Sequence, residues 1–263
     1  MVSLDTKKIV IKGLLIALVV VSTSIIHIPV PFTEGYIHGG DSIIFISGIL
    51  FGWQFGLVAG GLGSALADTI LGYTHWALPT LIIKGIMGAM IGFISNDFNK
   101  EKYFKYKNYI IVFMTFLWIG IVYILRSYLN KILMGINSLD ISKNYIHSLG
   151  FDSIDSFISS AQKVNTYLAI SMIILPFVIL LFYVIIKKRE GYINILNNII
   201  GMCISGIWMV IGYYIAGGIL KGNMIIPIFS IPANIIQFIG GGLIAYFLLM
   251  TLKRINGIDK YIT

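Results

Sequence analysis

Long apolar runs separated by short polar stretches limit what this chain can fold into more than any other feature of its sequence. The run at residues 166–186, for example, contains no charged residue. A helix of about 20 apolar residues spans the core of a bilayer, whereas the strands of a transmembrane barrel are shorter and alternate in polarity. Only 11% of the chain is charged, against about 25% in a soluble domain. We therefore predict an all-α, polytopic bundle of membrane helices.

The apolar runs predict eight helices, two of which are joined by a tight turn near Gly52. Seven of them have approximate bounds of 9–28, 42–55, 80–98, 109–125, 166–186, 195–220 and 225–252, and the third helix starts after the turn and has Asp68 and Thr69 near its far end. A long polar segment at 127–165 separates the fifth helix from the sixth. Within it, apolar residues recur at helical spacing, which predicts an amphipathic helix lying on the membrane surface. These residues are Ile154, Phe157, Ile158, Ala161 and Val164.

Positive charge is distributed unevenly along the chain. With eight crossings both termini lie on one side, and most cations then fall on that side: Lys7, Lys8, Lys12, Lys100, Lys102, Lys105, Lys107, Lys187, Lys188, Arg189, Lys253, Arg254 and Lys260. The opposite side receives only Arg126, Lys131, Lys143, Lys163 and Lys221. Cytoplasmic loops carry the excess of Lys and Arg, so we expect a cell-membrane protein with both termini cytoplasmic. The net charge of +8 is then a topology signal, and no nucleic-acid partner is expected.

Polar and aromatic residues that a membrane helix does not need gather at the outward ends of the first four helices. They are Glu34, Tyr36, His38, Asp41, Asp68, Tyr73, His75, Trp76 and Lys84. The last two helices add Trp208, Tyr213, Asn234 and Gln237. Ligand pockets combine apolar and aromatic walls with a few polar groups, and amides both donate and accept hydrogen bonds. We expect an outward-facing site for a flat heteroaromatic solute, with no charged residue at mid-membrane and hence no ion relay.

Each of these residues also has a purely structural interpretation. Asp68 and Lys84 would form an ion pair that joins two helices. Asp41 would cap the helix that follows it, and Trp76 would belong to the aromatic belt at the membrane boundary. The two amides of the last helix would only hold helices together.

Several chemistries have no signal in the sequence. The four histidines and the acidic residues show no metal-ligand spacing, so no metal is expected. No nucleotide-binding G-x-x-x-x-G-K-[ST], no H-E-x-x-H and no G-x-S-x-G occurs. We therefore expect neither an enzyme nor a cofactor, and any ATP must be hydrolysed by partner subunits.

The first helix carries a stripe of small residues, Gly13, Ala17 and Val21, at four-residue spacing. Such stripes allow another helix to approach closely. The neighbouring helix belongs either to the same bundle or to a partner protein.

Five stretches together resemble a known family. They are G-D-S-I-I-F-I-S-G-I-L-F-G at 40–52, G-G-L-G-S-A-L-A-D at 60–68, P-T-L-I-I-K-G-I-M-G at 79–88, W-M-V-I-G-Y-Y at 208–214 and P-A-N-I-I-Q at 232–237. They are similar to the substrate-binding S components of energy-coupling factor (ECF) vitamin transporters. The likeness is to the riboflavin-type subgroup, which includes transporters proposed for pyridoxine and hydroxymethylpyrimidine, and it covers about residues 8–96 and 197–254.

The resemblance implies a six-helix core that binds a vitamin from outside. It also implies association with a transmembrane coupling subunit and two ATPase subunits, and toppling in the membrane to release the cargo. The coupling subunit would meet the stripe Gly13, Ala17 and Val21, although Val21 is larger than the usual alanine.

The chain departs from the family in its middle. We predict two core halves at 1–98 and 194–263, with an insertion at 99–193 that holds two transmembrane helices and a long extracellular loop. Two other functions remain: a self-sufficient carrier, or an intramembrane enzyme. The sequence shows neither the inverted repeats frequent in such carriers nor a catalytic motif.

Overall fold

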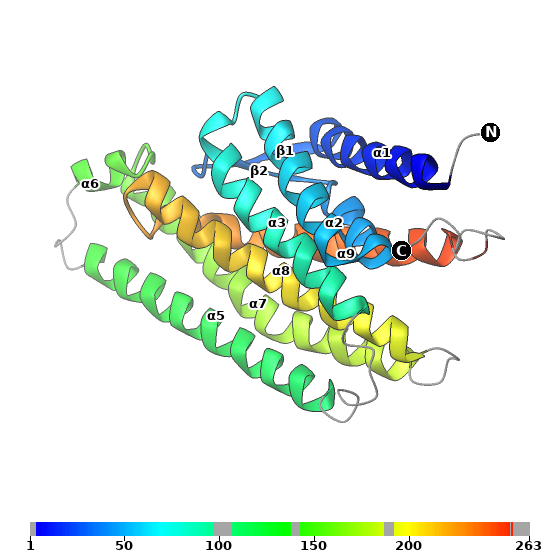
Figure 1. Ribbon diagram of the computed structural model, residues 1–263. Coiled ribbons are helices and arrows are strands. Elements are labelled where there is room, and N and C mark those ends of the chain that lie inside the picture. The colour runs from blue at the N-terminus through cyan, green and yellow to red at the C-terminus, as the bar shows by residue number, and fades with distance from the viewer. Residues whose placement is uncertain (1–3, 97–106, 138–142, 187–191, 253, 255–263) are drawn as a thin grey trace.

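The computed structural model describes residues 4–96, 107–137, 143–186, 192–252 and 254 (Figure 1). The helices are α1 (Leu4–Ile25), α2 (Asp41–Ile70), α3 (Thr74–Asn96), α5 (Lys107–Asn137), α6 (Lys143–Ser148), α7 (Ile154–Ile186), α8 (Tyr192–Lys221) and α9 (Ile231–Leu252). A 3-10 turn, η2 (Ile226–Ser230), precedes α9, and two strands, β1 (His27–Val30) and β2 (Gly35–His38), follow α1. Within the described residues seven helices are long and apolar enough to cross a membrane. The predicted all-α, multi-pass membrane fold is confirmed.

Helix α2 is two helical limbs that fold back on each other at Gly52. Gly52 has φ 78° and ψ 179°, a conformation that is essentially restricted to glycine. The two limbs contact each other on either side of Gly52. A Cβ placed on Gly56 would lie only 3.0 Å from the Cα of Gly48. Eight residues of a straight helix would separate these two positions by about 12 Å. The expected tight turn near Gly52 is therefore present.

Glycines let the second limb of α2 and helix α3 touch backbone to backbone. A Cβ on Gly56 would lie 2.1 Å from the carbonyl oxygen of Gly88, and one on Gly60 would lie 2.3 Å from that of Lys84. Side chains are excluded from such a contact, so van der Waals packing of the two backbones holds the helices together. This contact fixes the position of Lys84 in the bundle.

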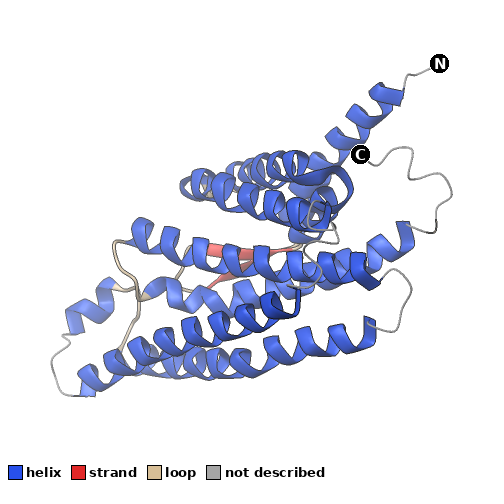
Figure 2. Ribbon diagram, turned by 60° about the horizontal axis from the view of Figure 1, so that its bottom comes forward, coloured by secondary structure: helices blue, strands red, loops and turns tan. Residues whose placement is uncertain are grey.

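A β-hairpin replaces the loop that was expected after α1. Strands β1 and β2 pair antiparallel, with His27 opposite His38 and Val30 opposite Gly35. Thr33 closes the connection between the strands, since its hydroxyl donates to the carbonyl oxygen of Val30 at 2.9 Å. Strand β2 is the partly buried strand of the pair and contacts α1 and α9, whereas β1 is mostly exposed; Figure 2 shows both strands in red. Strands of four residues with prolines in and after them give little sequence signal.

The hairpin and the turns at 71–73 and 222–225 lie at one end of the bundle, which we call the hairpin end. Helices α1 and α9 have their terminal residues at the opposite end, so both ends of the described chain lie on the same side (Figure 1). We call this side the terminal end. An even number of helical limbs, with α2 counted as two, produces this arrangement. The cations Lys100, Lys102, Lys105, Lys187, Lys188, Arg189, Lys253 and Lys260 fall outside the described residues.

The small-residue stripe of α1 does not pack against the described helices of the bundle. Gly13, Ala17 and Val21 are all exposed, and a Cβ on Gly13 would meet nothing within 4 Å. Helix α1 packs on α2 through its other face, where Val19 and Thr23 are fully buried. The interpretation of the stripe as packing within the bundle is therefore wrong for this chain.

The polar segment 127–165 is largely helical, which corrects the expected long loop. Helix α5 continues past Leu125 to Asn137, and the expected surface helix is the first part of the continuous helix α7. Polar side chains here join the two helices: Arg126 Nε donates to Asn165 Oδ1 at 2.8 Å, and Asn165 Nδ2 donates to Asn130 Oδ1 at 2.8 Å. Polar residues that form hydrogen bonds between helices have the same composition as a loop, so the sequence alone suggested a loop here.

An aromatic cluster connects α6 and α7 to the hairpin. Phe32, in the loop between the strands, stacks on Phe151 with ring centroids 4.1 Å apart, and Phe151 contacts Phe229 of η2 at 5.3 Å. Phe157 of α7 packs edge-on against Phe151. The division into 1–98, 99–193 and 194–263 stays a prediction.

Candidate ligand-binding site

A cavity opens at the hairpin end between the β-hairpin and helices α2, α3, α8 and α9. It encloses about 580 Å³, a volume that includes its opening to solvent. Its lining consists of Val30, Thr33, Gly35, Tyr36, His38, Asp68, Trp76, Thr80, Tyr213, Gly217, Lys221, Ile226, Pro227, Ser230, Asn234 and Gln237.

Aromatic side chains form one wall of the cavity. Trp76 is buried, and its Nε1–H donates to the carbonyl oxygen of Glu34 at 2.8 Å. Tyr213 meets Trp76 edge-on at 5.8 Å between centroids and donates from its hydroxyl to Thr80 Oγ1 at 3.2 Å. The interpretation of Trp76 as a belt residue is therefore wrong, because the indole helps hold the hairpin over the cavity.

Asp68, near the end of α2, is the acidic group of the cavity wall. Its Oδ1 accepts a hydrogen bond from the hydroxyl of Tyr36 at 2.5 Å. Burial, followed by the negative charge of Asp68, raises the pKa of Tyr36 above its usual value, so the phenol stays protonated as the donor. Asp68 Oδ2 is buried and has no hydrogen-bond partner among the described residues.

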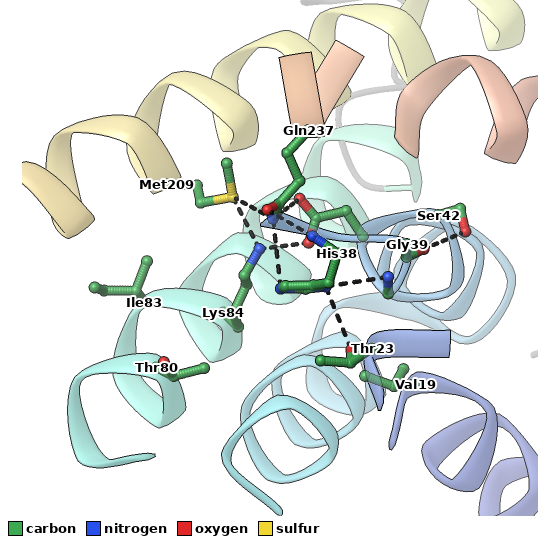
Figure 3. Close-up of polar contacts among 12 residues, drawn as sticks. Val19, Thr23, His38, Gly39, Ser42, Thr80, Ile83, Lys84, Met209 and Gln237 are labelled. Carbon is green, nitrogen blue, oxygen red and sulfur yellow. Dashed lines mark hydrogen bonds and ion pairs between the residues drawn. The ribbon is translucent and has the colours of Figure 1, made fainter. Parts of the chain in front are cut away.

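The floor of the cavity is a network that ties the hairpin to α3 and α9 (Figure 3). Gln237 Oε1 accepts from the backbone N–H of His38 at 3.1 Å, and Gln237 Nε2 donates to Asp41 Oδ2 at 2.9 Å. The ammonium of Lys84 forms an ion pair with Asp41 Oδ1, and both residues are fully buried. Lys84 Nζ also lies 2.9 Å from Met209 Sδ of α8. Every hydrogen-bonding group of Gln237 is thus engaged by the protein itself.

His38 is neutral in this network. The backbone N–H of Gly40 donates to His38 Nδ1 at 3.1 Å, so that nitrogen is an acceptor and the ring proton resides on Nε2. Removal from solvent, with a further contribution from the positive charge of Lys84, lowers the pKa of His38. The Thr23 hydroxyl of α1 lies 3.3 Å from the same Nδ1 atom.

Lys84 and Asp41 lie nearer the middle of the helical bundle than we predicted from the sequence. Helix α3 begins at Thr74 and ends at Asn96, which places Lys84 midway along it. The expectation that no charged residue lies at mid-membrane is therefore wrong. The sequence-based prediction started this helix at residue 80, which placed Lys84 only one turn from the outer end of the helix. Lys84 and Asp41 are nevertheless paired with each other, and a pair of this kind does not indicate an ion relay.

The partner of Lys84 was also predicted incorrectly. Lys84 pairs with Asp41, not with Asp68. Asp41 does not act as a helix cap, because the cap position is Gly40 and no side-chain capping bond is present there.

An exposed ion pair stands beside the mouth of the cavity. Lys221 Nζ lies 2.6 Å from Glu34 Oε2, and His75 Nε2 lies 3.9 Å from the same oxygen. The hydrogen bond and positive charge of Lys221 lower the pKa of Glu34.

Seven of the predicted site residues line the cavity: Tyr36, His38, Asp68, Trp76, Tyr213, Asn234 and Gln237. The other six do not line it: Glu34, Asp41, Tyr73, His75, Lys84 and Trp208. Asp41 and Lys84 support the floor, Glu34 and His75 flank the mouth, and Tyr73 packs against Tyr36. Trp208 joins α8 to α3 through a hydrogen bond to the carbonyl oxygen of Ile83.

Sequence reasoning missed Thr80, Lys221 and Ser230, which contribute polar groups to the lining. Thr80 and Lys221 lie next to predicted helix boundaries, and that proximity was the available signal. Among the described residues no group of three His, Cys, Asp or Glu side chains is arranged to hold a metal ion.

A multi-pass helical bundle with an aromatic-walled cavity at one end defines a solute-binding membrane protein. The family described as "ECF-type riboflavin transporter, S component" matches residues 3–162 and 156–254, and the chain belongs to this family. It is a family of transporter components rather than enzymes.

Two relatives share part of the sequence. An "Uncharacterized protein in gap 3′region" from Pyrococcus woesei is 48% identical over 77 residues, which is 29% of this chain and 51% of the relative. A UPF0397 protein from Streptococcus agalactiae is 28% identical over 89 residues, or 34% of this chain and 48% of the relative. The chain spans about half the length of the curated relatives it matches. No solved structure matches it significantly.

Proposed function

We propose that this protein is the substrate-binding subunit of an ECF-type transporter and captures a small heteroaromatic vitamin or precursor for ATP-driven uptake. The observation that carries the proposal is the cavity, whose aromatic wall stands above a polar floor. Trp76 and Tyr213 offer ring faces to a flat ligand, and Asn234 adds an amide to the cavity lining that makes no hydrogen bond to the described residues. Family membership supports the same role.

The hairpin end faces outward in this proposal. Lys7, Lys8 and Lys12 lie in the first turns of α1 and Arg254 follows α9, all at the terminal end. Cytoplasmic segments carry the excess of Lys and Arg, so both termini are cytoplasmic and the cavity collects solute from outside. Labelling of cysteines introduced at residues 34 and 7 with an impermeant reagent tests the orientation, and protection of residue 34 in intact cells would reverse it.

The cargo belongs to the riboflavin, pyridoxine or hydroxymethylpyrimidine class. Mass spectrometry of the ligand retained after gentle purification in detergent identifies it. A retained ligand without a heteroaromatic ring contradicts this assignment.

Asn234→Ala is expected to weaken ligand binding while leaving the protein as stable as the wild type. Asn234 is 7% exposed and lines the cavity, and its amide makes no hydrogen bond within the part of the chain that the structure describes. Loss of one hydrogen bond corresponds to a decrease in affinity of a few-fold to about tenfold. Calorimetric titration with the identified ligand measures the affinity. Gln162→Ala, at an exposed amide of α7, is the matched control and should change nothing.

The partners in this proposal are a transmembrane coupling subunit and two ATPase subunits, and α1 is the surface that meets them. Ala17→Leu should lower the recovery of co-purified coupling subunit by about tenfold, because a bulky side chain separates helices that pack through small residues. Ligand affinity should not change, since Ala17 points away from the cavity. Gly120→Leu, at another open helical glycine, is the control. Equal recovery from both variants excludes α1 as the contact.

A self-sufficient carrier is the alternative. Vesicles containing this chain alone should show no net uptake of the identified vitamin. Uptake without an ATPase would contradict the proposed coupling.

A further inference from the structure

We propose that the cavity selects a cationic ligand whose N–H group pairs with the carboxylate of Asp68. The inference rests on the proposed function and narrows its substrate class. Heteroaromatic compounds that carry an ammonium substituent are favoured over compounds of the same shape that carry an uncharged group in its place.

The charges around the cavity leave Asp68 without a counter-ion. Lys84 is paired with Asp41 beneath the floor, and Lys221 is paired with Glu34 beside the mouth. These two pairs are neutral as units, so Asp68 gives the site a net charge of −1 from its described residues.

The two histidines near the site do not change this balance. His38 is neutral, because its Nδ1 accepts the hydrogen bond from the Gly40 N–H. His75 is exposed, and its nearest carboxylate is that of Glu34 at 3.9 Å. A bound cation would therefore be the counter-ion of Asp68.

The hydrogen bonding of Asp68 points to the same ligand. Its polar neighbours are hydroxyl groups: Tyr36 donates to Oδ1, and the Thr80 hydroxyl, which accepts from Tyr213, lies close enough to donate to the same carboxylate. Asp68 is 4% exposed, and its Oδ2 has no hydrogen-bond partner among the described residues. An unpaired buried carboxylate oxygen is costly. An ionised carboxylate only accepts hydrogen bonds, so the ligand must supply the donor.

The aromatic wall also favours positive charge. Tyr36, Trp76 and Tyr213 line the cavity together with Asp68. The faces of aromatic rings attract cations, most strongly where water is displaced. A flat ring that bears an ammonium group gains stacking and charge attraction between these side chains, whereas the same ring with an uncharged group gains less charge attraction.

The test compares two probes that differ at one substituent. Pyridoxamine carries an ammonium group at neutral pH where pyridoxine carries a hydroxyl group. Calorimetric titration of the full-length protein in detergent should show about tenfold to a hundredfold tighter binding of pyridoxamine, the range of a charge-assisted hydrogen bond. In Asp68→Asn this preference should disappear, while the affinity for pyridoxine stays within a few-fold of the wild type.

A second variant protects the test against misfolding of Asp68→Asn. Tyr36→Phe retains the carboxylate and removes its hydroxyl partner, so the preference for pyridoxamine should be kept or increased. A thermal unfolding midpoint and a single peak in size-exclusion chromatography establish folding for both variants.

The possible outcomes separate this inference from the proposed function. Equal binding of the two probes, or tighter binding of pyridoxine, overturns the cationic preference and leaves the vitamin-binding role standing. The cationic preference is also overturned if the protein retains a neutral vitamin, such as riboflavin, and binds it with unchanged affinity in Asp68→Asn. Absence of any bound or retained heteroaromatic compound overturns both.

Discussion

Lys84→Met is expected to destabilise the folded protein by about 3–5 kcal/mol, because it leaves a buried carboxylate without its cation. Asp41 and Lys84 are both fully buried, and Gln237 would remain the only hydrogen-bond donor to the Asp41 side chain among the described residues. Methionine keeps most of the lysine volume, so the change removes charge with little loss of packing. The thermal unfolding midpoint in a fixed detergent should fall sharply, and expression in the membrane should decrease.

Two further variants show whether charge is the cause. The double change Asp41→Asn with Lys84→Met removes both charges and should recover most of the lost stability, since neutral replacements of buried pairs are often well tolerated. Lys221→Met breaks the ion pair at the mouth, where Glu34 is 67% exposed. Exposed pairs contribute about 1 kcal/mol or less, so this control should barely move the midpoint. A Lys84→Met protein as stable as the control would show that Asp41 finds another partner.

Gly88→Ala should be similarly damaging for a steric reason. A Cβ at this position would lie 2.0 Å from the carbonyl oxygen of Gly56, and backbone atoms surround it. No flexible side chain can move aside, so α2 and α3 must separate along their whole contact. We expect a loss of about 3 kcal/mol or more, at the upper end of the usual cost of overpacking.

The control for this variant is Gly240→Ala in α9, where an added Cβ would meet nothing within 4 Å. Alanine has the better helix propensity by about 1 kcal/mol, so the control should be neutral or slightly stabilising. Unfolding midpoints and the yield of monodisperse protein measure both variants. Equal behaviour of Gly88→Ala and Gly240→Ala would show that the two helices are not packed as closely as the structure indicates.

The helices were predictable because hydrophobic length is a local property of the sequence. The turn at Gly52 was predictable for the same reason, since glycine and its neighbours interrupt the apolar run. The β-hairpin was not, because each strand has four residues and its pairing depends on contacts with α1 and α9. The extension of α5 and α7 was missed because Arg126 and Asn165 bond to each other across helices, which makes helical residues look like a loop.

The residues of the site were largely predictable from the sequence, but how far each of them lies inside the bundle was not. Spacing along the sequence identified Asp68, Trp76 and Gln237, all of which line the cavity. It could not show that Asp41 enters the middle of the bundle, because that depends on how far the hairpin reaches inward. The pairing of Lys84 with Asp41 instead of Asp68 follows from this depth. Local patterns therefore identify polar groups, whereas the path of the chain decides which of them meet.

The cavity is closed at its bottom by the network that forms its floor. Gln237, Asp41 and Lys84 close it in the middle of the bundle, and below them Gly48, Gly56 and Gly88 bring the backbones of α2 and α3 into contact. Among the described residues, a solute that enters from the hairpin end meets this buried ion pair at the bottom of the cavity. In the transport role proposed above, the solute would then leave by the mouth through which it entered, once that mouth had been brought to the other side of the membrane.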